Sequence, residues 1–337
     1  MKTGVILLNF GEPEHPTMEE VVPFLERIFS LNSPLLGRAT PEEVRARSRE
    51  MAEARAPGLI AEYEEIGGSP LYAQAREQAE RLEAELVRRG HDAVVLLGMQ
   101  FTEPSIATAV ARAREAGAEV LVGLPVYPLA GPSTTVAALQ TLDAEVNRLG
   151  WSVPVREVSG WHLHPGYLDV RAAAIRRTAE ENGLSFADPA TKLVFSAHGT
   201  PLKYLEGGNG YELYVRDCCA RVAERVGAAD YVIGYQNHTN RPGLQWTQPD
   251  IDQVIASVDA ERVVVDACSF MHEQSETLAE LDHELRSEAE CRGLEFHRVP
   301  VPYAAPEFIS VLADLVEPFA RPGGGGLAGE TEEEVGG

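Results

Sequence analysis

The sequence predicts an α/β protein with two similar doubly wound lobes, parallel sheets and a cleft between the lobes. Short apolar runs alternate with longer amphipathic stretches, as in βαβ units. Some apolar runs are continuous, such as Val263-Val264-Val265, which is typical of strands covered on both faces. A pattern of four strands with their helices occurs once before and once after about residue 158.

The expected elements follow from the period of the apolar residues along the chain. Strands are predicted at 4–9, 93–97, 120–124, 153–158, 193–197, 231–235, 263–266 and 295–299. Helices are predicted at 18–29, 73–89, 106–115, 136–149, 166–181, 211–226, 251–258, 276–292 and 306–319. The stretch 40–56 is dense in Arg and Glu, so we expect either a helix or a mobile flap there.

These elements divide the chain into a first lobe at 1–157, a second lobe at 158–320 and a tail at 321–337. No Gly/Ser-rich linker marks the boundary between the lobes. The tail is Gly-rich and then acidic, and it has no apolar periodicity. We therefore expect the tail to be disordered and to lie outside the fold.

The composition excludes several classes of partner. The chain has 337 residues and a formal net charge of −23, which argues against a nucleic-acid partner and against docking on anionic lipid. The N-terminal apolar run is too short for a signal peptide, and no segment approaches the roughly 20 apolar residues of a membrane span. We expect a cytoplasmic protein without an integral membrane segment, and nothing in the sequence requires more than a monomer.

The four cysteines show no metal-binding spacing. Cys218, Cys219, Cys268 and Cys291 form no C-x-x-C pair, so the sequence contains no zinc or iron–sulfur pattern. We expect reduced structural thiols.

His198 is the most informative residue, because it ends the apolar run Leu193–Ala197 and is followed at once by Gly199. Ligands of open α/β sheets bind beyond the carboxyl ends of strands. Histidine exchanges protons near neutral pH, so it could act as a proton acceptor there. A lone histidine at a strand end is more often an ordinary polar residue, and that alternative stays open on this motif alone.

Acidic residues follow another strand of the second lobe. Glu273, Glu276, Glu280 and Glu284 recur at helical spacing, which aligns their carboxylates on one face. The face could be a solvated acidic surface, or it could be a row of oxygen ligands that passes a metal ion inward.

Trp246 lies on a loop after a further strand, where it could offer a flat apolar surface to a planar ligand or pack against the protein body. In the first lobe, Ser133 or Thr134 could cap a helix whose N-terminus is a candidate anion site. The sequence has no P-loop, no G-x-G-x-x-G and no nucleophile elbow.

Seven segments, in order from residue 4 to about 319, resemble the ferrochelatase family. They are Leu7-Leu8-Asn9-Phe10-Gly11-Glu12-Pro13, Ile66-Gly67-Gly68-Ser69-Pro70-Leu71, Gly98-Met99-Gln100-Phe101, Leu124-Pro125-Val126-Tyr127-Pro128, Phe195-Ser196-Ala197-His198-Gly199, Tyr235-Gln236 with Trp246, and Glu276-Thr277-Leu278.

This resemblance implies two Rossmann-like, chelatase-type lobes that hold a porphyrin and insert Fe²⁺ as a substrate metal, with no organic cofactor. The catalytic pair of the family corresponds to His198 and Glu276. The implied metal ligands are His198, Glu276, Glu280 and Glu284, and the implied porphyrin contacts are Phe10, Met99, Trp246, Tyr211 and Met271.

The chain departs from the family pattern at several positions. Gln100 replaces a usual Arg, Asn237-His238 replaces Ser-Arg or Ser-Lys, and Glu273-Gln274 replaces an acidic–His pair. Candidate substitutes for the lost cations are Arg38, Arg45 and Arg241. The cysteine-rich extension of some members is absent and no membrane-binding lip is evident, so we expect no iron–sulfur cluster and no membrane attachment.

Three hypotheses about function therefore remain. The first is a ferrochelatase, with coproporphyrin III favoured over protoporphyrin IX as its substrate. The second is a non-catalytic porphyrin or haem carrier, which the departures motivate. The third is a chelatase that inserts cobalt or nickel into another tetrapyrrole.

Overall fold

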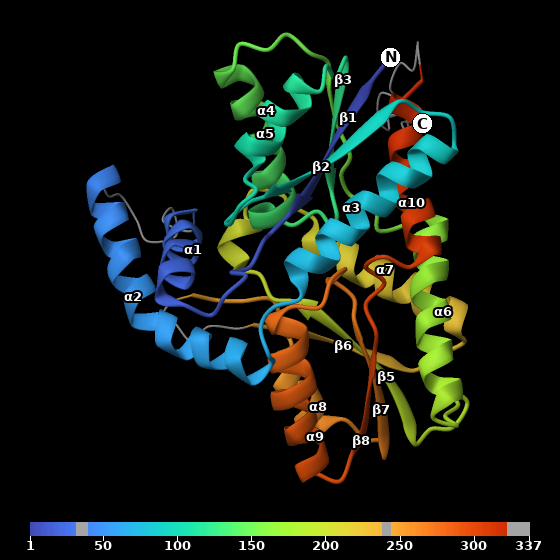
Figure 1. Cartoon of the computed structure of the whole chain (residues 1–337). Helices are drawn as coiled ribbons and strands as arrows, with labels where there is room; N and C mark the ends of the chain where they lie inside the picture. The colour runs from blue at the N-terminus through green and yellow to red at the C-terminus, as the bar shows by residue number, and fades with distance from the viewer. Residues whose placement is uncertain (32–39, 238–243, 322–337) are drawn as a thin grey trace, which may run out of the picture.

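The structure of the protein is a computed structural model, and it describes residues 1–31, 40–237 and 244–321. It contains two four-stranded parallel sheets, one above the other in Figure 1, with helices on both sides of each. The two-lobed α/β class predicted from the sequence is confirmed. Residues 322–337 of the predicted tail lie outside the described ranges.

The first sheet has the strand order β2-β1-β3-β4. All residues of the central strand β1 are buried, as expected for a parallel strand covered on both faces. The strands are β1 (Thr3–Asn9), β2 (Ala93–Met99), β3 (Val120–Pro125) and β4 (Val155–Glu157).

The second sheet repeats this topology with the order β6-β5-β7-β8. Its central strand β5 pairs with β6 and β7, so that the carboxyl ends of the three strands lie at one edge. The strands are β5 (Thr191–His198), β6 (Tyr231–Gln236), β7 (Arg262–Ala267) and β8 (Glu295–Val299).

Helices connect these strands and cover the sheets (Figure 1). The α-helices are α1 (Met18–Leu31), α2 (Pro41–Glu65), α3 (Leu71–Arg88), α4 (Ile106–Glu115), α5 (Ala137–Arg148), α6 (Pro165–Glu181), α7 (Tyr211–Val226), α8 (Ile251–Ser257), α9 (Arg286–Cys291) and α10 (Pro306–Val316). Shorter or π-helical segments are η2 (Pro132–Val136), η3 (Leu202–Tyr204), η4 (Glu276–Leu285) and η5 (Glu317–Phe319).

Helix α2 is longer than the stretch 40–56 predicted as a helix or a flap. Thr40 and Glu43 form a capping box that fixes its start. The helix continues through Pro57 to Glu65, although proline removes one backbone hydrogen bond. Buried Leu59 and Tyr63 pack in a hydrophobic cluster with α1, and this packing compensates for the lost bond.

The helix predicted at 276–292 consists of two parts. Residues of η4 form π-helical turns, and α9 continues the same segment as an α-helix. π-Helical turns are rare, and they are frequent at functional sites. In this chain they carry Glu276, Glu280 and Glu284.

The C-terminal helix α10 packs on the first-lobe helix α3 (Figure 1), although the predicted boundary assigns α10 to the second lobe. Gln78 of α3 donates a hydrogen bond to the carbonyl of Tyr303 (2.5 Å), and Arg81 donates one to the carbonyl of Ala304 (2.9 Å). These bonds attach the segment before α10 to the first lobe.

The four cysteines are free thiols, and all but the exposed Cys291 are buried. Burial raises the pKa of Cys218 and Cys219 above the usual thiol range, which makes these thiols unreactive. In the described ranges, no helix combines the length and apolar character needed to cross a membrane.

Candidate functional site

The candidate site lies at the carboxyl ends of strands in the second sheet. His198 is the last residue of β5, and it is paired in register with Gln236, the last residue of β6. Strand β7 ends at Ala267 and leads through a loop to Glu276, the first residue of η4. The parallel topology therefore brings together residues that are about 40 positions apart.

The contacts of His198 assign its proton. Nδ1 lies 2.6 Å from the carbonyl oxygen of Gly199, which can only accept, so Nδ1 carries the proton. Nε2 then has the lone pair, and Asn237 Nδ2 donates to it at 3.2 Å. Tyr211 and Ser269 hold the backbone, because Tyr211 Oη donates to the His198 carbonyl and the His198 N–H donates to Ser269 Oγ, both at 3.0 Å.

Glu276 is half-buried, and its carboxylate has two polar neighbours from the residues just before it. Gln274 Nε2 donates to Glu276 Oε2 at 2.6 Å, and Ser275 Oγ lies 3.2 Å from the same oxygen. The amide of Gln236 donates to the main-chain carbonyl of Glu276 at 2.8 Å. The end of β6 therefore fixes the first residue of η4.

The acidic row extends along η4 from Glu276 toward the surface. Gln236 Nε2 also donates to Glu280 Oε2 at 2.9 Å, whereas Glu284 is exposed. Burial and then the charge of Glu276 raise the pKa of Glu280 well above its usual range. The pKa of Glu284 is raised by desolvation and by nearby carboxylates, first that of Glu62 on α2. Such a row attracts cations.

Glu273 does not belong to this row, which corrects the predicted spacing of four carboxylates. Its Oε1 pairs with both terminal nitrogens of Arg298 at 3.0 Å, and its Oε2 accepts a hydrogen bond from Thr277. In the described part of the chain, no group of three or more His, Cys, Asp or Glu side chains could hold a metal ion. His198, Glu276, Glu280 and Glu284 are therefore not assembled into a closed ligand set.

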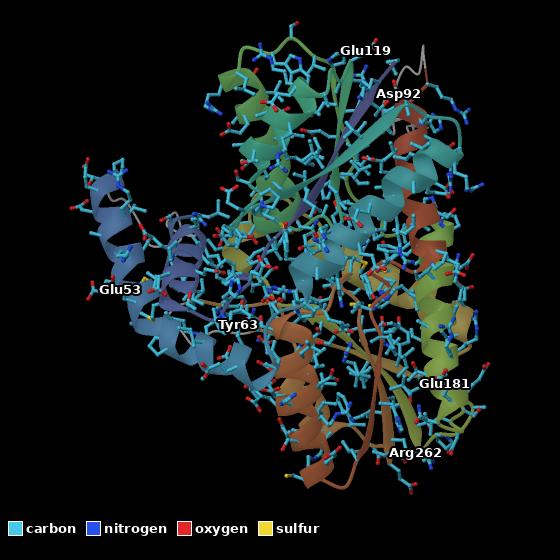
Figure 2. The ribbon with its side chains drawn as sticks, in the orientation of Figure 1. Glu53, Tyr63, Asp92, Glu119, Glu181 and Arg262 are labelled. Atoms are coloured by element: carbon cyan, nitrogen blue, oxygen red, sulfur yellow. The ribbon has the colours of Figure 1, made fainter. Side chains whose placement is uncertain are left out.

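Glu12 is a buried carboxylate near Glu276. Its oxygens accept hydrogen bonds from Tyr63 Oη (3.1 Å), Ser69 Oγ (2.5 Å) and Ser275 Oγ (2.5 Å). Tyr63 lies between the levels of the two sheets (Figure 2). Burial, followed by the charge of Glu276, raises the pKa of Glu12 to about 7.

Two of the predicted porphyrin contacts, Phe10 and Trp246, are half-buried aromatic side chains. Phe10 packs against Phe101 with ring centroids 4.6 Å apart. The Trp246 segment pairs with Pro201, so its loop lies against the segment that follows His198. Both loops leave aromatic surface close to the carboxyl ends of strands.

The other three predicted contacts are covered by protein in this structure. Met99 is 1% exposed, Met271 is 0% exposed, and both belong to the main hydrophobic core. Tyr211 is 4% exposed and supports the backbone of His198. Their role as porphyrin contacts therefore stays a prediction from the family resemblance.

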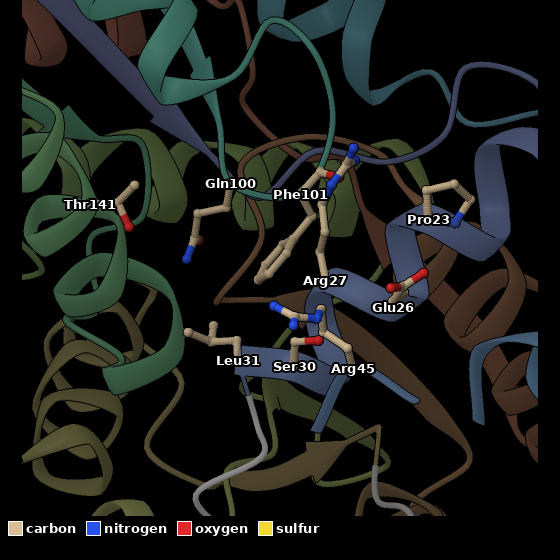
Figure 3. A pocket seen from close by; sticks show the side chains of 9 residues that line it. All are labelled: Pro23, Glu26, Arg27, Ser30, Leu31, Arg45, Gln100, Phe101 and Thr141. Carbon is tan, nitrogen blue, oxygen red and sulfur yellow. The ribbon is translucent and has the colours of Figure 1, made fainter. Parts of the chain in front are cut away.

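A cavity of about 550 Å³ lies beside Phe101, between α1, α2 and the loop after β2 (Figure 3). Arg27 and Arg45 contribute positive charge to it, Glu26 contributes a negative charge, and Gln100 lies on its wall. Arg27 also donates a hydrogen bond to the carbonyl of Phe101 at 2.6 Å. Of the three arginines named as substitutes, Arg45 lines this cavity, whereas Arg38 and Arg241 lie outside the described residues.

Sequence reasoning gave no role to Glu12, Asn237 or His272. Glu12 lies within a segment that resembles the family, but a single sequence does not show that Ser275 contacts it. The contact of Asn237 with His198 depends on a positive φ of 61°, which Asn tolerates better than most residues. His272 is 1% exposed, and neither of its ring nitrogens has a hydrogen-bond partner among the described residues. Burial lowers its pKa to about 3.

Comparison with known proteins gives one family. A sequence profile described as Ferrochelatase matches residues 2–319. A ferrochelatase of Synechococcus sp. (strain JA-2-3B'a(2-13)) is 35% identical over 328 residues, which cover 94% of this chain and 92% of the relative. The ferrochelatase of Aquifex aeolicus (strain VF5) is 32% identical over 323 residues, covering 94% and 99%.

Solved structures share the fold at low sequence identity. SirB from Bacillus subtilis, solved with Fe³⁺, matches with a TM-score of 0.53 and 10% identity over 95% of this chain and 96% of SirB. DR2241 from Deinococcus radiodurans, described as similar to chelatases, matches with a TM-score of 0.51 and 17% identity over 93% of this chain and 54% of that protein. At these identities the likeness shows the fold alone.

Proposed function

The chain belongs to the ferrochelatase family, and we propose that it inserts Fe²⁺ into a porphyrin to form haem. The observation that carries this proposal is the environment of His198. Its proton lies on Nδ1, which leaves an available lone pair on Nε2 at the carboxyl end of β5. Insertion of one Fe²⁺ releases two pyrrole protons, so a neutral imidazole at the ring is the group that the reaction needs.

His198 accepts one of these protons at Nε2. The pyrrole N–H takes the place of the Asn237 amide, which donates to Nε2 in the absence of substrate. The Gly199 carbonyl continues to accept from Nδ1–H and stabilises the imidazolium that forms. Tyr211 keeps the backbone of His198 in place during this exchange.

Glu276 binds the incoming Fe²⁺, takes the second proton, or does both. The metal reaches it along Glu284 and Glu280, whose carboxylates lie on successive turns of η4. Gln236 holds Glu280 and the main chain of Glu276 together, so the row remains aligned. Carboxylates and imidazole do not select Fe²⁺ strongly over Co²⁺ or Zn²⁺, so these ions compete.

Phe10 and Trp246 supply apolar walls for the macrocycle. A ring bent between these walls presents its nitrogen lone pairs to the metal, and such distortion favours the transition state. Met99, Met271 and Tyr211 support the walls from the core, where they are covered by protein.

The substrate is coproporphyrin III rather than protoporphyrin IX. Coproporphyrin carries more propionates, and the cavity beside Phe101 has two cationic side chains, Arg27 and Arg45. Arg45 lies 3.7 Å from the carboxylate of Glu42, but its side chain is 65% exposed, so it can exchange this partner for a propionate. A charge-assisted hydrogen bond from arginine is among the stronger polar contacts that a protein makes.

Parallel anaerobic assays of Fe²⁺ insertion into both porphyrins test this function. We expect faster insertion into coproporphyrin III, and Arg45→Gln should raise its KM roughly tenfold because one charged contact is lost. Arg76→Gln on α3, whose side chain is 64% exposed, is the matched control and should leave the KM unchanged.

Three outcomes would contradict parts of the proposal. Faster insertion into protoporphyrin IX would reverse the substrate assignment. Tight porphyrin binding without insertion would instead support a non-catalytic carrier. Insertion of cobalt or nickel into another tetrapyrrole, with no activity toward Fe²⁺, would support a different chelatase.

The remaining expectations rest on the sequence and family alone. We propose a single chain as the working unit, activity in the cytoplasm, and a reaction without an organic cofactor or an iron–sulfur cluster.

A further inference from the structure

Glu12 connects three parts of the chain next to Glu276. It follows β1, it accepts hydrogen bonds from Tyr63 on α2 and from Ser69 in the α2–α3 connection, and it accepts another from Ser275 before η4. The contact with Ser275 spans 263 residues of sequence. Glu12 therefore links the first lobe to the start of the helix that carries the acidic row.

The surroundings of Glu12 are unusual for a carboxylate. The side chain is 5% exposed, and its hydrogen-bond partners are hydroxyl and amide groups rather than a cation. Burying a carboxylate is unfavourable unless its oxygens are well hydrogen-bonded. The four donors that converge on Glu12 offset part of this cost, and they also hold the side chain in place.

Ser275 is held at two points by Glu12. Its Oγ donates to Glu12 Oε1 at 2.5 Å, and its backbone N–H lies 3.3 Å from Oε2. The same Oγ lies 3.2 Å from Glu276 Oε2. A hydroxyl carries one proton, and the shorter contact takes it. Glu12 therefore withholds the Ser275 proton from Glu276.

We propose that Glu12 is a positioning residue for Glu276. By anchoring Ser275, Glu12 fixes the residue that immediately precedes η4 and so sets the direction of the Glu276 carboxylate. By retaining the Ser275 proton, Glu12 leaves a lone pair of Glu276 available to a divalent cation. Gln274 remains the side-chain donor to Glu276. The inference rests on the proposed function, because it assigns Glu276 to the entering metal.

The variants Glu12→Gln and Ser275→Ala test this role through steady-state insertion kinetics. We expect kcat/KM for Fe²⁺ to fall roughly 10- to 100-fold, because small displacements of a reacting group reduce rates by such factors. The KM for porphyrin should stay within about twofold of wild type, since neither residue lies on the proposed ring walls. Glu14→Gln is the matched control, because Glu14 is exposed in the same loop.

A double-mutant cycle separates positioning from a general structural role. Co²⁺ binding to the ring-free protein, followed by visible absorption, is measured for Glu12→Gln in the wild-type and Glu276→Gln backgrounds. If Glu12 positions Glu276, Glu12→Gln should weaken Co²⁺ binding roughly tenfold in the wild-type background. In the Glu276→Gln background it should weaken Co²⁺ binding by less than about twofold. Ser275→Ala provides the same comparison if Glu12→Gln does not fold.

Different results would overturn the proposed function and the positioning role of Glu12. A wild-type protein that binds Co²⁺ but inserts no Fe²⁺ would overturn the proposed function and leave the cycle interpretable. Equal losses of Co²⁺ affinity in both backgrounds, no loss in either, or no Co²⁺ binding by the wild type would overturn the role of Glu12.

Discussion

At the scale of single residues, the two ring nitrogens of His198 have different partners. The Gly199 carbonyl can only accept, whereas the Asn237 amide donates, so the two contacts favour one neutral tautomer. This arrangement prepares Nε2 to accept a proton. The sequence predicted the position of His198 at a strand end, but it could not predict the tautomer, because the contact with Asn237 depends on a loop that follows a different strand.

Glu12 makes a testable contribution to the pH dependence of stability. Its pKa is raised from its ordinary value of 4.5 to about 7 in the folded protein, first by burial and then by the charge of Glu276. The folded state therefore binds this proton more tightly than the unfolded state does. The resulting stability is fully present below about pH 4.5 and is lost as the pH rises through 7.

Urea unfolding at pH 5 and pH 8 checks this prediction. We expect the free energy of unfolding of the wild type to fall between these pH values, and Glu12→Gln to lose on the order of 2 kcal/mol less than the wild type. Glu14→Gln is the control and should behave as the wild type does. The same pH-dependent loss in Glu12→Gln and wild type would show that Glu12 does not titrate in this range.

At the scale of elements, η4 aligns three carboxylates in a row that leads from the surface inward. Its three carboxylates at four-residue spacing run from half-buried Glu276 to exposed Glu284. Glu62 on α2 adds a carboxylate near the outer end. The row therefore extends negative charge from the surface along η4 to Glu276, and negative charge attracts cations.

Replacing the carboxylates of η4 with amides, one residue at a time, tests whether the row is directional. Glu284→Gln should raise the KM for Fe²⁺ roughly twofold to fivefold and weaken its dependence on ionic strength, because an exposed charge acts mainly by attraction. Glu280→Gln should reduce kcat/KM for Fe²⁺ more strongly, since Glu280 lies deeper. Glu290→Gln, exposed on α9 and outside the four-residue spacing, is the control. Equal effects of all three variants would argue against a directional row.

The same helix shows where sequence reasoning succeeds and where it stops. The spacing of Glu276, Glu280 and Glu284 placed them on one helix, and the structure agrees. The same spacing wrongly included Glu273, because the sequence does not reveal that Arg298 on β8 pairs with it. The π-helical turns could not be predicted either, because α- and π-helical segments share similar apolar patterns.

Helix α2 gives a second example at this scale. The sequence of 40–56 left a helix and a flap open, because the stretch is dense in Arg and Glu. The capping box at Thr40 and the burial of Tyr63 decide in favour of one long helix. Tyr63 then contributes a hydroxyl to Glu12, so the length of α2 bears directly on the candidate site.

At the scale of the whole molecule, the repeated strand–helix pattern predicted both sheets, and all eight predicted strands occur. Alternation of apolar runs is a local property, so a single sequence suffices to detect it. Contacts between distant segments are not local. The bond between Glu12 and Ser275 and the packing of α10 on α3 join the two halves, and neither follows from periodicity.

The central claim is that the chain inserts Fe²⁺ into a porphyrin with His198 as the proton acceptor. This reaction needs the base, the acidic row and the aromatic ring walls together, and these come from separate strands and loops. Replacing His198 removes the base while Phe10 and Trp246 remain, so ring binding and insertion should separate.

The most direct measurement is therefore anaerobic Fe²⁺ insertion by His198→Ala beside porphyrin titration of the same variant. We predict that insertion falls by at least about 100-fold, as expected for loss of a general base, while the dissociation constant for porphyrin stays within a few-fold of wild type. Near-wild-type insertion by His198→Ala would contradict the account.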